Sequence, residues 1–183
     1  DARRKGIGGS DAGAVLGISP FKSSFQVFCE KTNLVEDTPA NDFLYWGSKL
    51  EPLISARYEE ETKRSVLRPE LKIFSNPEIP WLRCSLDGII EKAEGKDGVG
   101  ILEVKTTASH KKQSWEEKIP AHYQSQIQHA LATTGCSWGS FAILFGGQRF
   151  LWLDIERDDD YIKTMLEAEE RFWRMVEEKT PPP

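Results

Sequence analysis

Two neighbouring apolar runs, residues 81–90 and 99–107, constrain this chain more than any other feature. Both runs are rich in β-branched and large apolar side chains. The segment between them, 91–98, is polar and holds two glycines, so the pair is typical of a β-hairpin. Because alternate side chains of a strand share a face, Glu103 and Lys105 point to the same side. A strand that otherwise looks buried thus carries a carboxylate and an ammonium group together.

Asp87, near the end of the first run, is a second carboxylate that could act together with this charged pair. Burying a carboxylate and an ammonium without a task costs several kcal/mol of desolvation. If Asp87 lies across from Glu103, both carboxylates can bind Mg²⁺, which fills its other positions with water and phosphate oxygens. The Val104 carbonyl is a further candidate ligand, and Lys105 would bind or activate the attacking water and offset charge on the phosphate. A second ion about 3.5–4 Å away would stabilise the leaving oxygen, and Mn²⁺ is expected to substitute for Mg²⁺.

The short Asp…Glu-x-Lys pattern is degenerate when it is taken alone. The alternative is an ordinary hairpin in which Asp87 and Gly88 end a strand, while Glu103 and Lys105 form a solvated ion pair. Other parts of the chain must therefore decide whether the pattern predicts a nuclease.

Five short motifs in one order decide it. The first reads Arg-Arg-Lys-Gly-Ile-Gly-Gly-Ser-Asp-Ala, the second Leu-Tyr-Trp-Gly-Ser-Lys-Leu-Glu, and the last Pro-Ala-His-Tyr-Gln-Ser-Gln-Ile-Gln. Between them come Ser-Leu-Asp-Gly and Glu-Val-Lys. In this order, the motifs are residues 3–12, 44–51, 85–88, 103–105 and 120–128. Together they resemble the lambda-exonuclease family, also called YqaJ-type viral recombinases, within the PD-(D/E)XK nuclease superfamily.

The resemblance implies a fold and an activity. It implies a single α/β nuclease domain over residues 1–183, with a central mixed sheet flanked by helices. The implied activity is a Mg²⁺-dependent 5′-to-3′ exonuclease on double-stranded DNA ends in phage or prophage recombination. Such an enzyme leaves 3′ single-stranded overhangs for an annealing protein, and family members of this kind form trimeric rings.

The resemblance also implies roles for residues outside the central pair. Gly8 and Gly9 before a helix present free amides, which suits an anion. The roles carried over are the terminal 5′-phosphate site for Arg3, Ser10, Ser85 and Gln126, a position near the metals for Glu51, with a metal contact through water, and a wedge into the duplex end for Leu44. Gln126 also counts among the catalytic residues. The alternatives are simple helix capping for Ser10, a frayed basic terminus for Arg3, a solvated charge for Glu51 and a core leucine for Leu44.

The negative net charge of the chain is unusual for a DNA-binding protein, because phosphate contacts normally require a basic surface. The formal charge is −5, but residues 154–183 hold ten acidic and five basic side chains, which accounts for the whole excess. Residues 1–153 balance at nineteen of each sign. Three clusters of basic residues are expected to face DNA. The first is residues 3–5, the second is residues 63–64 with Arg68 and Lys72, and the third is Lys105 with residues 110–112.

The remaining features fit a compact enzyme. At 183 residues the chain is long enough for a real core, and no apolar stretch approaches the length of a membrane span. Three scattered cysteines indicate neither a disulfide framework nor a zinc site, so a cytoplasmic location is expected. The expected helices are 10–17, 23–31, 41–63, 121–134 and 158–179. The expected strands are 65–68, 71–74, 81–90, 99–107, 140–145 and 149–155.

Two rival functions remain open. One is a nicking or structure-specific endonuclease built on the same core. The other is a DNA-end-binding recombination scaffold whose metal site is vestigial. The intact Asp87, Glu103 and Lys105 argue against the scaffold.

Overall fold

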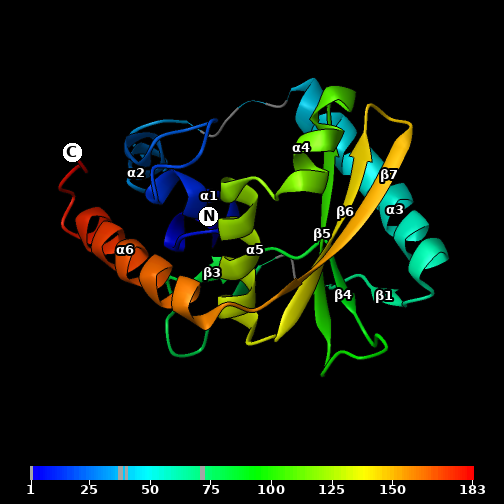
Figure 1. Ribbon diagram of the computed structural model, residues 1–183. Coiled ribbons are helices and arrows are strands. Elements are labelled where there is room, and N and C mark those ends of the chain that lie inside the picture. The colour runs from blue at the N-terminus through cyan, green and yellow to red at the C-terminus, as the bar shows by residue number, and fades with distance from the viewer. Residues whose placement is uncertain (1, 37–38, 40, 71–72) are drawn as a thin grey trace.

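A five-stranded mixed sheet in the order β1-β4-β5-β6-β7 forms the centre of the protein (Figure 1). The computed structural model describes residues 2–36, 39, 41–70 and 73–183. The strands are β1 Val66–Leu67, β4 Gly88–Ile90, β5 Gly100–Thr107, β6 Trp138–Phe145 and β7 Arg149–Glu156. β5 and β6 are parallel, and the other neighbours are antiparallel. A separate pair, β2 Phe74–Ser75 and β3 Arg83–Cys84, lies outside this sheet.

Helices cover both faces of the sheet. On one face Ile101 and Ile143 pack with α4, Lys112–Glu117, and α5, Ala121–Thr134. On the other face, Leu102 packs with α3, Asp42–Thr62. The alternation of side chains along β5 therefore sends successive residues into two different cores. This is an α/β arrangement with a central mixed sheet flanked by helices, as predicted.

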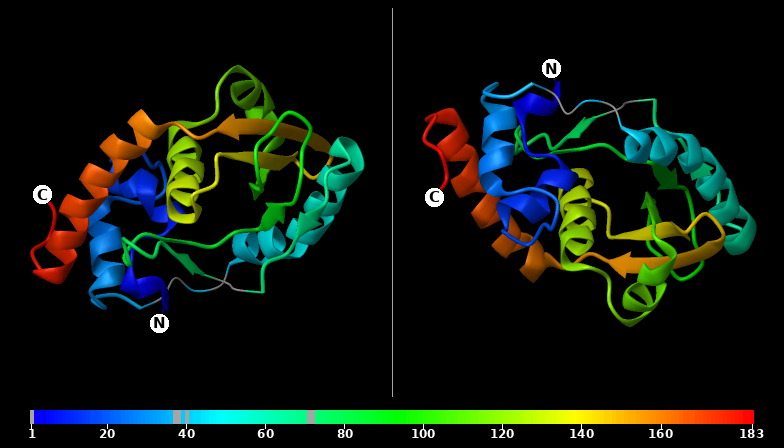
Figure 2. Two further views of the ribbon diagram at one scale, coloured as in Figure 1. Left: turned by 90° about the horizontal axis from the view of Figure 1, so that it is seen from below. Right: turned by 90° about the horizontal axis from the view of Figure 1, so that it is seen from above.

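The remaining helices gather at the end of the molecule away from α3 (Figure 2). They are η1 Ala2–Lys5, α1 Gly9–Val15, α2 Ser24–Lys31 and α6 Asp159–Glu177. Ile7 and Phe28 share a core with Phe172 of α6, so the start and the end of the chain pack together. α1 also contacts α5, which brings the N-terminal motif next to the central sheet.

Most of the predicted elements are present, and the predicted strand 81–90 is wrong. Arg83 and Cys84 pair with β2, whereas β4 begins only at Gly88 and pairs with β5. Residues 85–87 therefore run between two sheets and belong to neither. Leu82 explains part of the division, because it bridges to Ile7 of the N-terminal segment.

The cap of α1 and three short helices also differ from the sequence prediction. Ser10 is not the N-cap of α1, because the cap is Gly8, whose N–H donates to the Asp11 carboxylate at 3.0 Å. The short helices η1, η2 (Ser109–Lys111) and α4 were not expected. Residues 71–72, including part of a predicted strand and the basic Lys72, lie outside the described residues.

A buried ion-pair network fixes the first turn of α1. Asp11 is 5% exposed, and its carboxylate oxygens lie 2.7 Å from the Nζ atoms of Lys22 and Lys31. Lys31 Nζ also donates to the Arg3 carbonyl at 2.8 Å. Burial alone would raise the pKa of Asp11, but the two ammonium groups outweigh burial and lower that pKa to about 2. The network thus ties α1, α2 and η1 together.

Asp11→Asn is expected to lower the free energy of unfolding at neutral pH by roughly 3–5 kcal/mol, because buried Lys31 loses its carboxylate partner. The pKa of Asp11 is lower in the folded state than in the unfolded state. Its stabilising contribution is therefore complete above about pH 4 and is lost as the pH falls towards about 2. Urea unfolding of wild type and variant at neutral and acidic pH measures both effects.

The matched control is Glu60→Gln, since the Glu60 side chain is 67% exposed and pairs with Arg57 only at the surface. Its unfolding free energy should change by less than about 1 kcal/mol. A similar loss for both variants, or a loss that persists unchanged in acid, would contradict the proposed contribution of Asp11.

Candidate active site

The predicted carboxylates meet where β4 stops pairing with β5. Gly88 pairs with Leu102, which places Asp87 opposite Glu103. Asp87 Oδ2 accepts a hydrogen bond from the Val104 N–H at 2.8 Å. Because the N–H and C=O of one strand residue point to the same side, the Val104 carbonyl also points towards this edge. The predicted juxtaposition of the two carboxylates is therefore present, together with a backbone oxygen.

Glu103 is held by two side chains. It is 5% exposed, and its Oε1 accepts hydrogen bonds from Lys105 Nζ at 2.7 Å and from Gln126 Nε2 at 2.6 Å. Lys105 Nζ also lies 5.0 Å from the centre of the Tyr123 ring. The parallel β5–β6 connection runs through α5, which is why Gln126 and Tyr123 reach the middle of β5. The solvated ion pair proposed as the alternative is excluded, because Glu103 is buried.

The electrostatics of the site favour a cation. Burial and, to a smaller extent, the Glu103 carboxylate raise the pKa of Asp87 to about 8, although the Val104 N–H and Lys105 act to lower it. Burial also raises the pKa of Glu51, where Arg68 acts to lower it and Glu103 to raise it. Burial acts to lower the pKa of Lys105, but Glu103 and Asp87 together leave it raised. Carboxylates that repel one another in this way would be relieved by a divalent ion.

The donor set suits a hydrated ion better than a closed protein cage. Within the described ranges, no three His, Cys, Asp or Glu side chains converge closely enough to enclose a metal. Asp87 and Glu103 with a backbone carbonyl match Mg²⁺, which uses one or two carboxylates and keeps several waters. Glu51, on α3, is half-buried and close enough to interact electrostatically with both carboxylates. This position fits its predicted contact through water.

The N-terminal motif lies against Gln126. A Cβ atom on Gly9 would come within 3.2 Å of the Gln126 carbonyl oxygen, so glycine allows this close approach. Ser10 and Ser85 are exposed, and Ser10 makes no capping hydrogen bond. Simple capping is therefore excluded for Ser10.

The structure also contradicts the structural alternatives for Arg3 and Leu44, a frayed terminus and a core leucine. η1 is anchored, because Lys31 donates to the Arg3 carbonyl and Arg83 Nη1 donates to the Ala2 carbonyl at 3.1 Å. The alternative of a frayed terminus for Arg3 is therefore wrong. Leu44 lies in the first turn of α3 and is 56% exposed, so it is not a core leucine.

Two polar residues beside Gln126 have structural roles that the sequence did not reveal. Gln128 Nε2 donates to the Glu156 carbonyl at 2.8 Å, and its Oε1 accepts from the Asp158 N–H at 3.0 Å. His129 is fully buried and lies 2.8 Å from both Glu169 Oε1 and the Arg83 carbonyl. They fix α5 against β3, β7 and α6, and so position Gln126.

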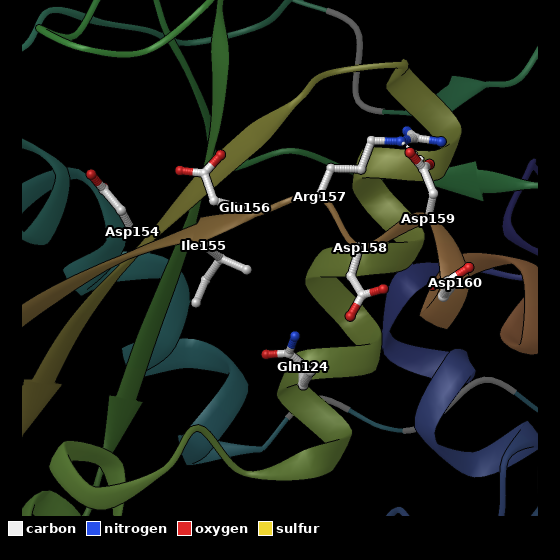
Figure 3. Close-up of a pocket in the computed structure, with 8 residues that line it drawn as sticks. All are labelled: Gln124, Asp154, Ile155, Glu156, Arg157, Asp158, Asp159 and Asp160. Atoms are coloured by element: carbon white, nitrogen blue, oxygen red, sulfur yellow. Dashed lines mark hydrogen bonds and ion pairs between the residues drawn. The ribbon is translucent and has the colours of Figure 1, made fainter.

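An acidic hollow at the start of α6 is a separate feature (Figure 3). Its carboxylates largely serve the structure: Asp154 binds Arg64, and Asp158 caps α6 by accepting from the Tyr161 N–H. The residues that line it are Gln124 and 154–160. None of the predicted site residues lies among them.

Comparison with known proteins identifies the family. Residues 1–137 match the model of the YqaJ-like viral recombinase domain. The chain belongs to the YqaJ-like viral recombinase family. This family member is 38% identical over 177 residues to the YqaJ protein of Bacillus subtilis strain 168, covering 93% of the chain. It spans 53% of the length of that relative.

Solved structures share the fold of this YqaJ-like domain. The alkaline exonuclease LHK-Exo of Laribacter hongkongensis matches with a TM-score of 0.75 and 23% identity, covering 98% of this chain and 91% of LHK-Exo. A structure of LHK-Exo in complex with dAMP matches with a TM-score of 0.76. A phage-related exonuclease from Haemophilus somnus 129PT has a TM-score of 0.66 and 14% identity, covering 95% of this chain and 96% of that exonuclease. In the described part of the YqaJ-like chain, no helix has the length and apolar character needed to cross a membrane.

Proposed function

We propose that this chain is a Mg²⁺-dependent exonuclease that degrades one strand of duplex DNA from its 5′ end during phage or prophage recombination. The observation that carries the proposal is the meeting of Asp87 and Glu103 at the edge of β5, with Lys105 bonded to Glu103. Membership of the YqaJ-like family and the fold shared with two exonucleases support it. The dAMP bound to LHK-Exo is a nucleoside monophosphate, the class of product that an exonuclease releases.

The residues of the site divide the work of phosphodiester hydrolysis. Asp87, Glu103 and the Val104 carbonyl would hold Mg²⁺, with Glu51 acting through water, and Mn²⁺ would substitute. Two bound ions would lower the pKa of the attacking water and stabilise the leaving oxygen. Lys105 presents its ammonium group where negative charge develops on the scissile phosphate. Gln126 holds Glu103 in one orientation through its Nε2 hydrogen bond.

The 5′ polarity rests on the N-terminal motif. Arg3, Ser10, Ser85 and Gln126 would bind the terminal 5′-phosphate, and Leu44 would enter the end of the duplex. The exposed hydroxyls of Ser10 and Ser85, and the contact of Gly9 with Gln126, support this part of the proposal. By resemblance to the family, the chain would act as a trimeric ring with a single-strand annealing protein as partner.

Linear duplex with a 5′-phosphate should be degraded faster than duplex with a 5′-hydroxyl, and closed circular DNA should resist. Arg3→Ala should remove most of the preference, because a charged hydrogen bond of this kind is worth about 1.5–3 kcal/mol, or roughly ten- to a hundredfold in rate. Arg171→Ala, on the exposed side of α6, is the matched control and should keep the preference. Release of label from either strand end gives the polarity.

The rival functions make different predictions in the same experiment. Rapid cutting of circles, with equal rates on both kinds of end, would favour the nicking or structure-specific endonuclease. Binding to DNA ends without hydrolysis of any substrate would favour the scaffold.

A further inference from the structure

An exposed aromatic side chain, Phe21, lies beside the candidate active site. It is 72% exposed, in the segment between α1 and α2. Its ring meets His122 edge to face, with ring centres 5.3 Å apart and an angle of 85° between the planes. The backbone around it is held, because the Phe21 N–H donates to Ser19 Oγ at 3.2 Å and Lys22 binds Asp11. The ring is therefore exposed, while the backbone that carries it is held.

A row of ring contacts connects Phe21 to Lys105. The rings of His122 and Tyr123 lie 4.1 Å apart, and Lys105 Nζ lies 5.0 Å from the Tyr123 ring centre. Lys105 in turn binds Glu103 at 2.7 Å. Successive nucleotides of one DNA strand rise about 3.4 Å along the helix. The row thus places Phe21 within a few nucleotides of a phosphate bound at Lys105.

The open face of the ring is suited to a nucleobase. Exposing a phenylalanine in water is unfavourable, whereas nucleobases stack on aromatic faces with little dependence on sequence. Phe25, the next exposed phenylalanine, offers a contrast. It is 51% exposed, but it stacks on Phe28 within α2, with ring centres 6.4 Å apart and planes at 21°. Phe21 instead meets His122 with the two ring planes at 85°, and at 72% exposure most of its surface is free.

We propose that Phe21 is a stacking platform for a nucleobase near the 5′ end of the strand that is degraded. The inference rests on the proposed function, since it assumes that DNA is bound with a phosphate at Lys105. It adds a stacking contact to a site otherwise built from groups that bind phosphate and metal and from Leu44 at the end of the duplex. Stacking of one base near the 5′ end would hold the strand in register for hydrolysis.

The test measures binding of short 5′-phosphorylated duplexes in EDTA, so that hydrolysis does not interfere. Phe21→Ala should weaken binding of the intact duplex by roughly 5- to 150-fold, and Phe21→Trp should restore it. Three further duplexes each carry one abasic residue, at the first, second or third position from the 5′ end. One of the three should bind wild type as weakly as the intact duplex binds Phe21→Ala, and its abasic position is the sensitive one. Phe21→Ala should bind the duplex with an abasic residue at the sensitive position no more weakly than it binds the intact duplex.

The controls separate stacking from packing. Phe25→Ala should bind all duplexes like wild type. If Phe21→Ala loses the same factor on intact and abasic duplexes, the residue supports His122 and the inference fails. If only abasic residues in the complementary strand matter, the base belongs to that strand, and the inference fails as stated.

The outcomes also separate this inference from the proposed function. One outcome is that Phe21→Ala weakens binding of the intact duplex but not of the abasic duplex, while no duplex is hydrolysed with Mg²⁺. In that case the stacking platform is supported and the exonuclease proposal fails. If duplexes are degraded from the 5′ end but Phe21→Ala binds every duplex like wild type, the platform alone fails. Failure of wild type to bind any duplex overturns both.

Discussion

Asp87→Asn and Glu103→Gln are each expected to lower the rate of duplex hydrolysis by at least about 100-fold. Both changes keep the shape of the side chain and remove the negative charge that would bind Mg²⁺. Asn at position 87 can still accept the hydrogen bond from the Val104 N–H, so the local backbone should hold. Single-turnover degradation of end-labelled duplex measures the effect.

A second readout does not depend on activity. Mg²⁺ at about 100 times its dissociation constant stabilises a one-site protein by about 2.7 kcal/mol, which raises the Tm of a chain of this length by roughly 5–10 °C. Wild type should show this shift, and both variants should lose most of it. Without metal, Asp87→Asn should be as stable as wild type or more stable, because it relieves repulsion between two carboxylates. Glu103→Gln should be less stable than Asp87→Asn, because it also removes the ion-pair partner of Lys105.

Asp160→Asn is the matched control for these measurements. Asp160 lines the acidic hollow of Figure 3 and is exposed. Its replacement should leave both the rate and the Mg²⁺-dependent shift unchanged. More than a few per cent of wild-type activity in Asp87→Asn or Glu103→Gln would contradict the assignment, as would an undiminished Mg²⁺ shift.

Lys105→Met is expected to slow the chemical step by roughly 100- to 1000-fold while weakening DNA binding much less. The ammonium group is largely buried, with 17% of the side chain exposed, and is fixed 2.7 Å from Glu103. A charge held in a low-dielectric site interacts strongly with charge that develops nearby during the reaction. Glu103 would still keep its hydrogen bond from Gln126, so the variant should fold.

The measurement compares single-turnover rates on pre-bound duplex with the affinity for the same duplex. Lys111→Met is the control, because Lys111 is exposed in η2, just beyond the end of β5. It should affect affinity slightly and the chemical step hardly at all. An unchanged rate with weaker binding in Lys105→Met would reduce Lys105 to a phosphate contact.

Helices and strands whose apolar side chains recur at a regular spacing could be predicted from the sequence. The apolar spacing predicts α3, α5 and α6, and all three helices are present within a few residues of the expected ends. The strand 99–107 is likewise confirmed as β5. The division of 81–90 could not be predicted, because an apolar run does not reveal which strand each residue pairs with. Leu82 bridges to Ile7, which is distant in sequence.

The same distinction applies to the site. Asp87, Glu103 and Lys105 were found because strand geometry relates neighbours along the chain and across a hairpin. The direct bond from Gln126 to Glu103 depends on how α5 crosses back over the sheet, which only the folded chain determines. The close approach of Gly9 to Gln126 depends on the packing of α1 on α5 in the same way.

The early end of β4 has a consequence for the behaviour of the protein in solution. β4 pairs with residues 100–102 of β5, and the strand continues to Thr107 beyond that point. The strand edge opened there could pair with a strand of another molecule and so begin aggregation. Charged side chains such as Glu103 and Lys105, together with the Asp87 carboxylate bound to the Val104 N–H, oppose such pairing. An apolar replacement of Asp87 would therefore endanger solubility as well as chemistry.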